Sequence, residues 1–218
     1  MQQQVGIDWR AMRRVTAAFT AAVMMSGCTP QSTGVGVVSP MSSKRVEGAR
    51  GMVVASQVDA AAAGAEVLRL GGNAVDAAVA TAFALSVVDI SQTGLGGGGA
   101  LTFYSAKTHR AEHLLFYPRS GDDPAWAHAS SDTAGGVRGA GRAAATPGMV
   151  AGLLEAHSRF GTLTRAQVMA PAIRLARDGF LVSPLLSRTI TSSKAKLSAD
   201  AAAVALFMPN GEALRPGE

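Results

Sequence analysis

The sequence offers few side chains in arrangements that are typical of catalysis or metal binding. Its four histidines, His109, His113, His128 and His157, lack metal-site spacings such as H-E-x-x-H, and we expect them at the surface. No serine lies in a G-x-S-x-G turn, and the single cysteine is Cys28, near the N-terminus. The sequence therefore shows no nucleophile with a partnered base, and it predicts neither a metal nor a cofactor.

An irregular loop in the middle of the chain holds the other candidates. Asp122 and Asp123 are adjacent carboxylates, which acid–base catalysis or a metal ion can use, but adjacent aspartates before a proline are typical of turns. Arg119, Arg138 and Arg142 belong to the same loop. A guanidinium fork suits a carboxylate ligand, and a solvated loop arginine is the alternative at each position.

Gly94, Gly96 and Gly99 have the spacing G-x-G-x-x-G of a dinucleotide-binding turn. That turn follows a strand and begins a helix, whereas here a helix is predicted before the glycines and a strand after them. We therefore reject the dinucleotide interpretation. The glycines instead indicate a backbone that passes very near a neighbouring strand.

Strong local signals surround the helix that precedes the glycine run. Gly71 and Gly72 can end a helix over residues 58–70, and Asn73 with Asp76 can begin the next one. From residue 74 to 88 almost every side chain is apolar, and most are alanine. This second helix is therefore predicted to be buried and closely packed on both sides.

Other segments have weaker signals. Residues 52–56 form a short β-like run, and residues 101–104 and 111–116 predict an antiparallel hairpin. Residues 117–142 form the irregular loop, and residues 187–207 predict one or two alanine-rich helices.

Two further helices are marked by their first residues. Thr146 is a plausible cap with Pro147 at the first helical position, and the helix ends near Gly161. Thr164 is predicted to cap the next helix, in which Pro171 would introduce a kink or an early break.

The first 28 residues have the features of an export signal. Three arginines precede an apolar stretch, residues 15–25, that is too short to span a bilayer as a mature helix. Two small residues, Ser26 and Gly27, then precede Cys28. The whole segment resembles a bacterial lipoprotein signal, although Met25 stands where leucine is usual. We expect an exported, periplasmic protein with a membrane lipid on Cys28; ordinary secretory cleavage and an uncleaved anchor are the alternatives.

Composition restricts the class of protein. Of 218 residues, 48% are apolar, which indicates a packed globular chain. The net charge is +5, but the cations are scattered along the chain, which argues against nucleic-acid binding. Aromatic residues make up only 5% beside many alanines and glycines, which suggests closely approaching helices. Residues 29–49 are rich in Ser, Pro, Gly and Thr and predict a flexible tether.

Five blocks, in order, carry a resemblance to one family. They are GMVVASQ (51–57), EVLRLGGNAVDAAVA (66–80), GLGGGGALTFY (94–104), ATPGMVAGLLEAHSRFGTL (145–163) and PAIRLARDGFLVS (171–183). They resemble the N-terminal part of the large subunit of the γ-glutamyltransferases, also called glutathione hydrolases. The resemblance covers residues 50–218 and implies an α+β fold, an incomplete part of the αββα sandwich of N-terminal-nucleophile hydrolases.

The resemblance also implies an activity and its partners. Such enzymes transfer or hydrolyse the γ-glutamyl group of glutathione and related amides through a threonine that self-cleavage exposes on a small subunit. This sequence does not reach that subunit, so we expect an N-terminal fragment, inactive alone, from a truncated gene model, a frameshifted gene or a split gene.

The resemblance implies one substrate-binding residue. In the family, an arginine in a motif of the type F-R-E-x-A-P holds the α-carboxylate of the γ-glutamyl group. Here Arg119 lies two residues late and is followed by Ser120, and without a short insertion Tyr117 occupies the arginine's place. We assign the role to Arg119, with Arg138 or Arg142 as substitutes. This departure keeps a β-lactam (cephalosporin) acylase of the same superfamily as an alternative, beside a non-catalytic lipoprotein.

Overall fold

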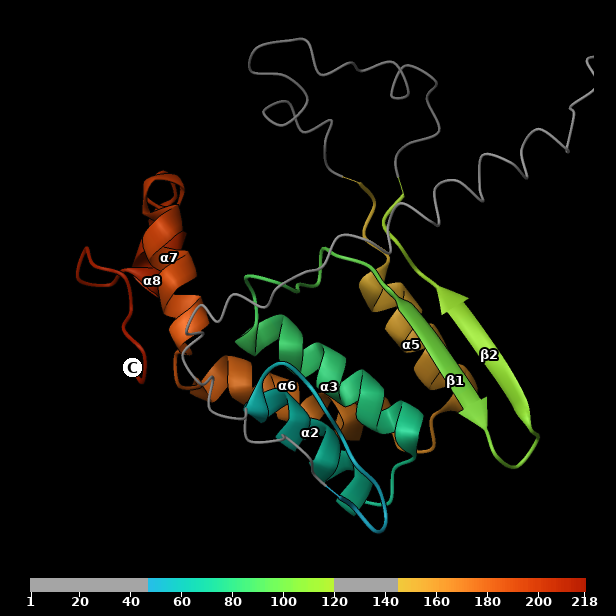
Figure 1. Cartoon of the computed structure of the whole chain (residues 1–218). Coiled ribbons are helices and arrows are strands. Elements are labelled where there is room, and N and C mark those ends of the chain that lie inside the picture. Colours follow the sequence, from blue (N-terminus) through green and yellow to red (C-terminus); the bar gives the residue numbers. More distant parts are fainter. Residues whose placement is uncertain (1–46, 120–144) are drawn as a thin grey trace, which may run out of the picture. The chain divides into compact units, whose positions relative to one another are not determined.

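The computed structural model describes residues 47–119 and 145–218. Its elements are α2 (Val58–Arg69), α3 (Ala74–Val88), β1 (Ala100–Ser105), β2 (Arg110–Leu115), α5 (Met149–Phe160), α6 (Arg165–Asp178), α7 (Pro184–Leu197) and α8 (Ala201–Phe207). Helices are combined with one antiparallel hairpin, β1–β2 (Figure 1). The described residues therefore have the mixed helix and strand content that was predicted.

The start of α3 and the end of α2 follow from local chemistry. Asn73 Oδ1 accepts hydrogen bonds from the N–H groups of Val75 (2.8 Å) and Asp76 (3.0 Å), while Asp76 Oδ2 accepts one from the Asn73 N–H (2.9 Å). This is a capping box, which satisfies the free N–H groups of a first turn. Just before it, Gly71 has a φ of 90°, a conformation that favours glycine and ends α2. Both predictions are confirmed.

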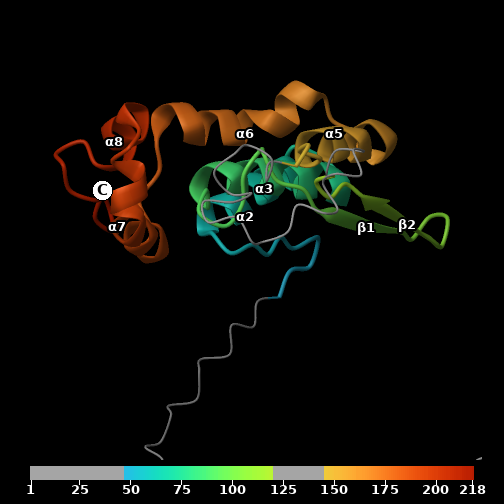
Figure 2. The same cartoon turned by 90° about the horizontal axis from the view of Figure 1, so that it is seen from above.

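Helix α3 packs against α2, α5 and α6 (Figure 2). A Cβ atom on Gly64 of α2 would lie 3.0 Å from the carbonyl oxygen of Ala77, so α2 and α3 approach closely, as the composition predicts. Most side chains of α3 are buried. However, Ala74 and Ala78 are exposed, so the prediction of close packing on both sides was wrong. No element among the described residues covers that face.

The hairpin packs one face against α5. Leu101 pairs with Leu114. The ring centroids of Phe103 and of Phe160 in α5 are 5.2 Å apart. The opposite face is open, with Tyr104 59% and Leu115 68% exposed. The predicted hairpin is confirmed, and it has one covered and one uncovered face.

The structure corrects three local predictions. Residues 52–56 are not a strand, because no other described strand pairs with them. Helix α6 continues through Pro171, which is buried, so of the predicted kink or early break the break does not occur. Helix α7 begins at Pro184 rather than residue 187, because Ser183 Oγ accepts a hydrogen bond from the Leu186 N–H (3.1 Å).

The C-terminal helices form a small second cluster. Its buried members are Val182, Leu186, Ile190 and Met208. The predicted alanine-rich region is thus two helices, α7 and α8, joined by a short turn.

Candidate functional site

The glycine run joins the hairpin to the N-terminus of α5. Gly97 O accepts hydrogen bonds from the N–H groups of Gly148 (3.1 Å) and Met149 (3.0 Å). Gly99 and Phe116 exchange both main-chain hydrogen bonds (3.3 and 2.9 Å), which extends the pairing of the hairpin. This short segment therefore fixes the end of the hairpin against the first turn of α5.

The glycine run passes so close to the end of β2 that Gly98 has no room for a side chain. A Cβ atom at Gly98 would lie 2.5 Å from Phe116 O and 2.8 Å from Pro118 N, closer than packed atoms allow. The close backbone passage predicted for the glycine run is confirmed. A helix (α3) precedes the run and a strand (β1) follows it, the reverse of a dinucleotide-binding turn.

Arg119 directly follows Pro118, the residue that contacts Gly98. Its N–H donates to Thr146 O (3.2 Å), and its carbonyl oxygen accepts from the Thr146 N–H (2.8 Å). Because Thr146 closely precedes Met149, the first residue of α5, the main chain of Arg119 is held near that helix N-terminus. The side chain is exposed, and no described residue forms a hydrogen bond or an ion pair with its guanidinium group.

This position favours an anionic ligand. The N-terminal end of a helix carries partial positive charge, and the Arg119 guanidinium adds a full charge with a planar set of donors that matches a carboxylate. Tyr117, which would occupy the family's arginine position if the chain has no short insertion there, is also exposed. The arrangement can hold a carboxylate beside the end of the hairpin.

Helix α5 begins later than predicted. Its N-cap is Gly148, without a side-chain cap, and Pro147 precedes the helix. Thr146 does not cap the first turn, because the helix begins two residues later, at Gly148, and the N–H groups of Gly148 and Met149 donate to Gly97 O instead. The end of α5 at Gly161 and the Thr164 cap of α6 are confirmed.

The other sequence candidates fall into two groups. His109 and His113 are exposed, as predicted, and their Nδ1 atoms contact hydroxyl groups of Tyr104 (3.2 Å) and Thr102 (2.9 Å). The following candidates lie outside the described residues: Cys28, Asp122, Asp123, His128, Arg138 and Arg142.

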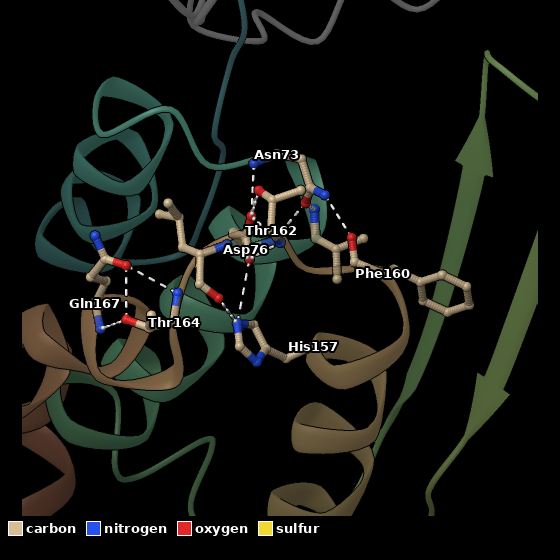
Figure 3. Close-up of polar contacts among 9 residues, drawn as sticks. Asn73, Asp76, His157, Phe160, Thr162, Thr164 and Gln167 are labelled. Carbon is tan, nitrogen blue, oxygen red and sulfur yellow. Dashed lines mark hydrogen bonds and ion pairs between the residues drawn. The ribbon is translucent and has the colours of Figure 1, made fainter.

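A buried polar cluster that the sequence did not predict surrounds Asp76 (Figure 3). The Asp76 side chain has no exposed surface. Besides capping α3, its carboxylate accepts hydrogen bonds from the Thr162 hydroxyl group (2.7 Å) and the Thr162 N–H (3.0 Å). Asn73 Nδ2 donates to Phe160 O (2.6 Å). The N-terminus of α3 is therefore fastened to the loop between α5 and α6.

His157 belongs to this cluster, so its predicted surface position was wrong. Its Nε2 lies 3.4 Å from Asp76 Oδ1 and 3.0 Å from Leu163 O, and its side chain is only 11% exposed. Because a carbonyl oxygen can only accept, Nε2 carries the proton. The Asn73–Asp76 spacing was a visible signal for the cap, but nothing local in the sequence connects Asp76 with His157.

Opposing effects act on the Asp76 carboxyl group. Burial raises its pKa, whereas hydrogen bonds from the Thr162 hydroxyl group and from the N–H groups of Asn73, Thr162 and Leu163 lower it. The pKa of Asp76 lies below its ordinary value of 3.8. The residue is therefore a buried anion with a structural role.

Within residues 47–119 and 145–218, no group of three or more His, Cys, Asp or Glu side chains could hold a metal ion. None of the helices described there has the length and apolar character needed to cross a membrane.

Comparisons with known proteins agree on one group. The family model for gamma-glutamyltranspeptidase matches residues 60–218. The chain is 40% identical to the acylase ACY 1 proenzyme of Pseudomonas sp. (strain V22), over 80% of this chain and 33% of that protein. It is 36% identical to the glutathione hydrolase proenzyme of Bacillus subtilis (strain 168), over 78% of this chain and 30% of that protein.

A solved structure extends the likeness to the fold. The chain resembles the Helicobacter pylori gamma-glutamyltranspeptidase with a TM-score of 0.71 and 27% identity, over 80% of this chain and 51% of that one. The fold is thus part of an N-terminal-nucleophile hydrolase fold. The chain spans about a third of the length of the two proenzymes it matches.

Proposed function

Because the chain belongs to the γ-glutamyltranspeptidase family, whose model matches residues 60–218, we propose that it is the N-terminal part of the large subunit of a glutathione hydrolase precursor. The complete enzyme transfers the γ-glutamyl group of glutathione, or of a related amide, to water or to an amino acid. In this division of roles, the chain contributes packing and substrate binding. A small subunit contributes the chemistry.

The reaction is acyl transfer through an ester. A threonine hydroxyl group of the small subunit attacks the γ-carbonyl carbon, and the α-amine of the same threonine takes the hydroxyl proton. The C–N bond then breaks, the proton passes to the departing amine, and water or an amino acid cleaves the ester. Since the attacking groups belong to the small subunit, we propose that the 218-residue chain is inactive alone.

The observation that supports a binding role is that the guanidinium group of Arg119 has no partner among the described residues. Its main chain is fixed by the bridge to Thr146, while its side chain is exposed and has no described partner. A γ-glutamyl group carries a free α-carboxylate, and a guanidinium fork can bind a carboxylate through two parallel hydrogen bonds. We assign Arg119 to that carboxylate.

Steady-state kinetics with γ-glutamyl-p-nitroanilide test this assignment. The enzyme is a chimaeric precursor, in which this chain replaces the matching part of the Bacillus subtilis relative. Arg119→Ala should lower kcat/KM by roughly 10- to 100-fold, since a hydrogen-bonded charge contributes about 1.5 to 3 kcal/mol. Arg119→Lys should recover part of the loss because it keeps the charge without the fork.

Arg110→Ala is the matched control, since Arg110 is an exposed arginine of β2. It should leave the kinetics unchanged. Equal rates for the wild-type chimaera and Arg119→Ala would remove Arg119 from the site. A chimaera that matures but does not turn over any γ-glutamyl compound would contradict the proposed activity.

A β-lactam acylase is the second candidate function. The 40% identity to an acylase proenzyme and the departure from F-R-E-x-A-P at Tyr117 and Ser120 both favour it. Assaying the same chimaera with an N-acylated cephalosporin separates the two activities. A kcat/KM for the cephalosporin above that for the γ-glutamyl anilide would make the acylase the better assignment.

Export is a separate proposal that rests on the sequence alone. We propose cleavage before Cys28 and a lipid on its thiol, which would attach the protein to a bacterial membrane from the periplasmic side. Metabolic labelling with a radioactive fatty acid should mark the wild-type chain and not Cys28→Ser. Equal labelling of both would contradict lipidation at this residue.

A further inference from the structure

A small, mainly apolar hollow is lined by the turn that follows α3 and by the two C-terminal helices. Its volume is about 190 Å³. Ile90 of the turn is 48% exposed, whereas Leu186 and Ile190 of α7 are buried. The apolar side chains that line the hollow are Ile90, Leu186, Ile190, Leu197 and Phe207. Water in the hollow therefore contacts apolar surface, which a fitting apolar ligand would remove from water.

The other lining residues, Ser91, Thr189 and Ser193, carry hydroxyl groups. Thr189 Oγ1 donates a hydrogen bond to Leu185 O within α7 (3.0 Å). Ser91 Oγ is buried and has no hydrogen-bond partner among the described residues, and the Ser193 hydroxyl group of α7 has none there either. Because buried polar atoms nearly always have a partner, Ser91 indicates a hydrogen-bonding group that this part of the chain does not supply.

We propose that this hollow binds a free, neutral small molecule built from one apolar ring and one hydrogen-bonding oxygen atom, of which phenol is the simplest. The ring contacts the apolar side chains, and the oxygen bonds to the hydroxyl groups of Ser91 and Ser193. Ser91 turns its hydroxyl group toward the ligand by rotation about its Cα–Cβ bond, between staggered positions. Arg119 does not line this hollow, so the site is separate from the proposed substrate site.

The size and the charge of the hollow select this ligand. An apolar cavity of roughly 150 Å³ can bind one benzene ring, so this hollow has room for one ring with a small substituent. No charged side chain lines it within the described part of the chain. A carboxylate or an ammonium group would therefore lose its hydration without gaining a counter-ion. A hydroxyl group suits the two serines, because it can both donate and accept a hydrogen bond.

A ligand in this hollow connects two parts of the core. Ile90 and Ser91 closely follow Val88, which belongs to the main core around α3, whereas Leu186 and Ile190 belong to the C-terminal cluster. The hollow exists only while both parts are folded and side by side. Binding should therefore raise the melting temperature as the ligand concentration increases.

Ligand-observed NMR titrations of the chimaeric precursor test the site with phenol, toluene and benzoate. The three compounds share one ring and differ in the substituent. Phenol and toluene should bind, and benzoate should not, because the hollow offers its charge no partner. Each compound that binds should also raise the melting temperature.

Serine variants test the hydrogen bonds. Ser91→Ala and Ser193→Ala should each lower the ratio of phenol affinity to toluene affinity by about 2- to 10-fold, as expected for the loss of one hydrogen bond. Ser192→Ala is the matched control, because Ser192 is an exposed serine of α7 that does not line the hollow. It should leave the ratio unchanged.

A larger side chain tests the place of binding. Ser193→Phe puts a ring into the hollow and should remove the binding of both phenol and toluene. Ser192→Phe adds the same ring at the neighbouring exposed position and should keep it. The melting temperatures of the unliganded variants show whether each one is folded.

Four outcomes would overturn the proposal. The first is a wild-type chimaera that binds no phenol, as when another part of the precursor fills the hollow. The others are benzoate that binds as tightly as phenol, an affinity ratio that both serine-to-alanine variants leave unchanged, and phenol binding that survives Ser193→Phe. None of these readouts needs turnover, so an inactive chimaera that binds phenol would contradict the proposed activity alone.

Discussion

At the scale of the residue, Asp76 shows how one side chain can serve two parts of the fold. Its carboxylate caps α3 through the Asn73 N–H and also accepts hydrogen bonds from Thr162 in the loop after α5. A buried carboxylate is costly unless its oxygens are satisfied, and here the Thr162 N–H reaches Oδ1 while the Thr162 hydroxyl group and the Asn73 N–H donate to Oδ2. The same bonds that stabilise the anion therefore connect two segments far apart in the sequence.

The lowered pKa of Asp76 sets a pH dependence. Because its pKa is lower in the folded state than the ordinary 3.8, the ionised carboxylate stabilises the fold fully above that value. The contribution is lost as the pH falls through the folded-state pKa. Asp76→Asn should lower the stability of the chimaeric precursor by about 3 kcal/mol at pH 7. Thermal unfolding should show this difference shrinking as the pH falls below 3.8.

Asp178→Asn is the control for this experiment. Asp178 is an exposed aspartate that pairs with its neighbour Arg177, and fully exposed ion pairs contribute little to stability because water screens them. A pH-independent difference between Asp76→Asn and the wild type would show that hydrogen bonding geometry, rather than the charge, explains the loss.

At the scale of the element, the glycine run acts as a joint between the hairpin and α5. Gly97 O accepts two N–H groups of the first turn of α5, and Gly98 passes against Phe116 and Pro118. The position of Arg119 depends on this joint, because Arg119 directly follows Pro118. Substitutions in the glycine run should therefore change both the stability of the protein and its substrate binding.

Gly98→Ala and Gly96→Ala form a matched pair that tests the joint. A Cβ atom at Gly98 would meet Phe116 O at 2.5 Å, whereas at Gly96 nothing lies within 4 Å. Overpacking of this kind typically costs about 1 to 3 kcal/mol. We expect Gly98→Ala to lower the melting temperature of the chimaeric precursor and to raise KM, and Gly96→Ala to change neither. Equal melting temperatures would contradict the close passage.

Local signals predicted elements well, and long-range partners explain what they missed. The Asn73 cap, the Gly71 stop and the Thr164 cap each depend on residues a few positions apart, so the sequence displays them. The errors at Thr146 and His157 share another cause. The start of α5 is decided by Gly97 and the position of His157 by the Asp76 cluster, which the fold brings from distant parts of the chain. The role of Arg119 itself stays a prediction.

At the scale of the whole molecule, the described residues form a helical core with uncovered apolar surface. Around α3 the buried core is continuous. By contrast, Val54, Tyr104 and Leu115 are each more than half exposed, and β1 keeps a free edge within the described part of the chain. Natural proteins usually cover or charge such edges because they pair readily with other chains.

The 218-residue chain expressed alone should therefore aggregate or be proteolysed rapidly. Without a partner over α3 and the outer face of the hairpin, these apolar surfaces remain in water and associate with one another. Size-exclusion chromatography should show large species, limited proteolysis should give short half-lives, and glutathione incubated with the chain should release no glutamate. Co-expression with the completing polypeptide should restore a single monodisperse species. A sharp, cooperative melt of the isolated chain would contradict the need for a partner, and release of glutamate by it unaided would contradict the separation of binding from chemistry.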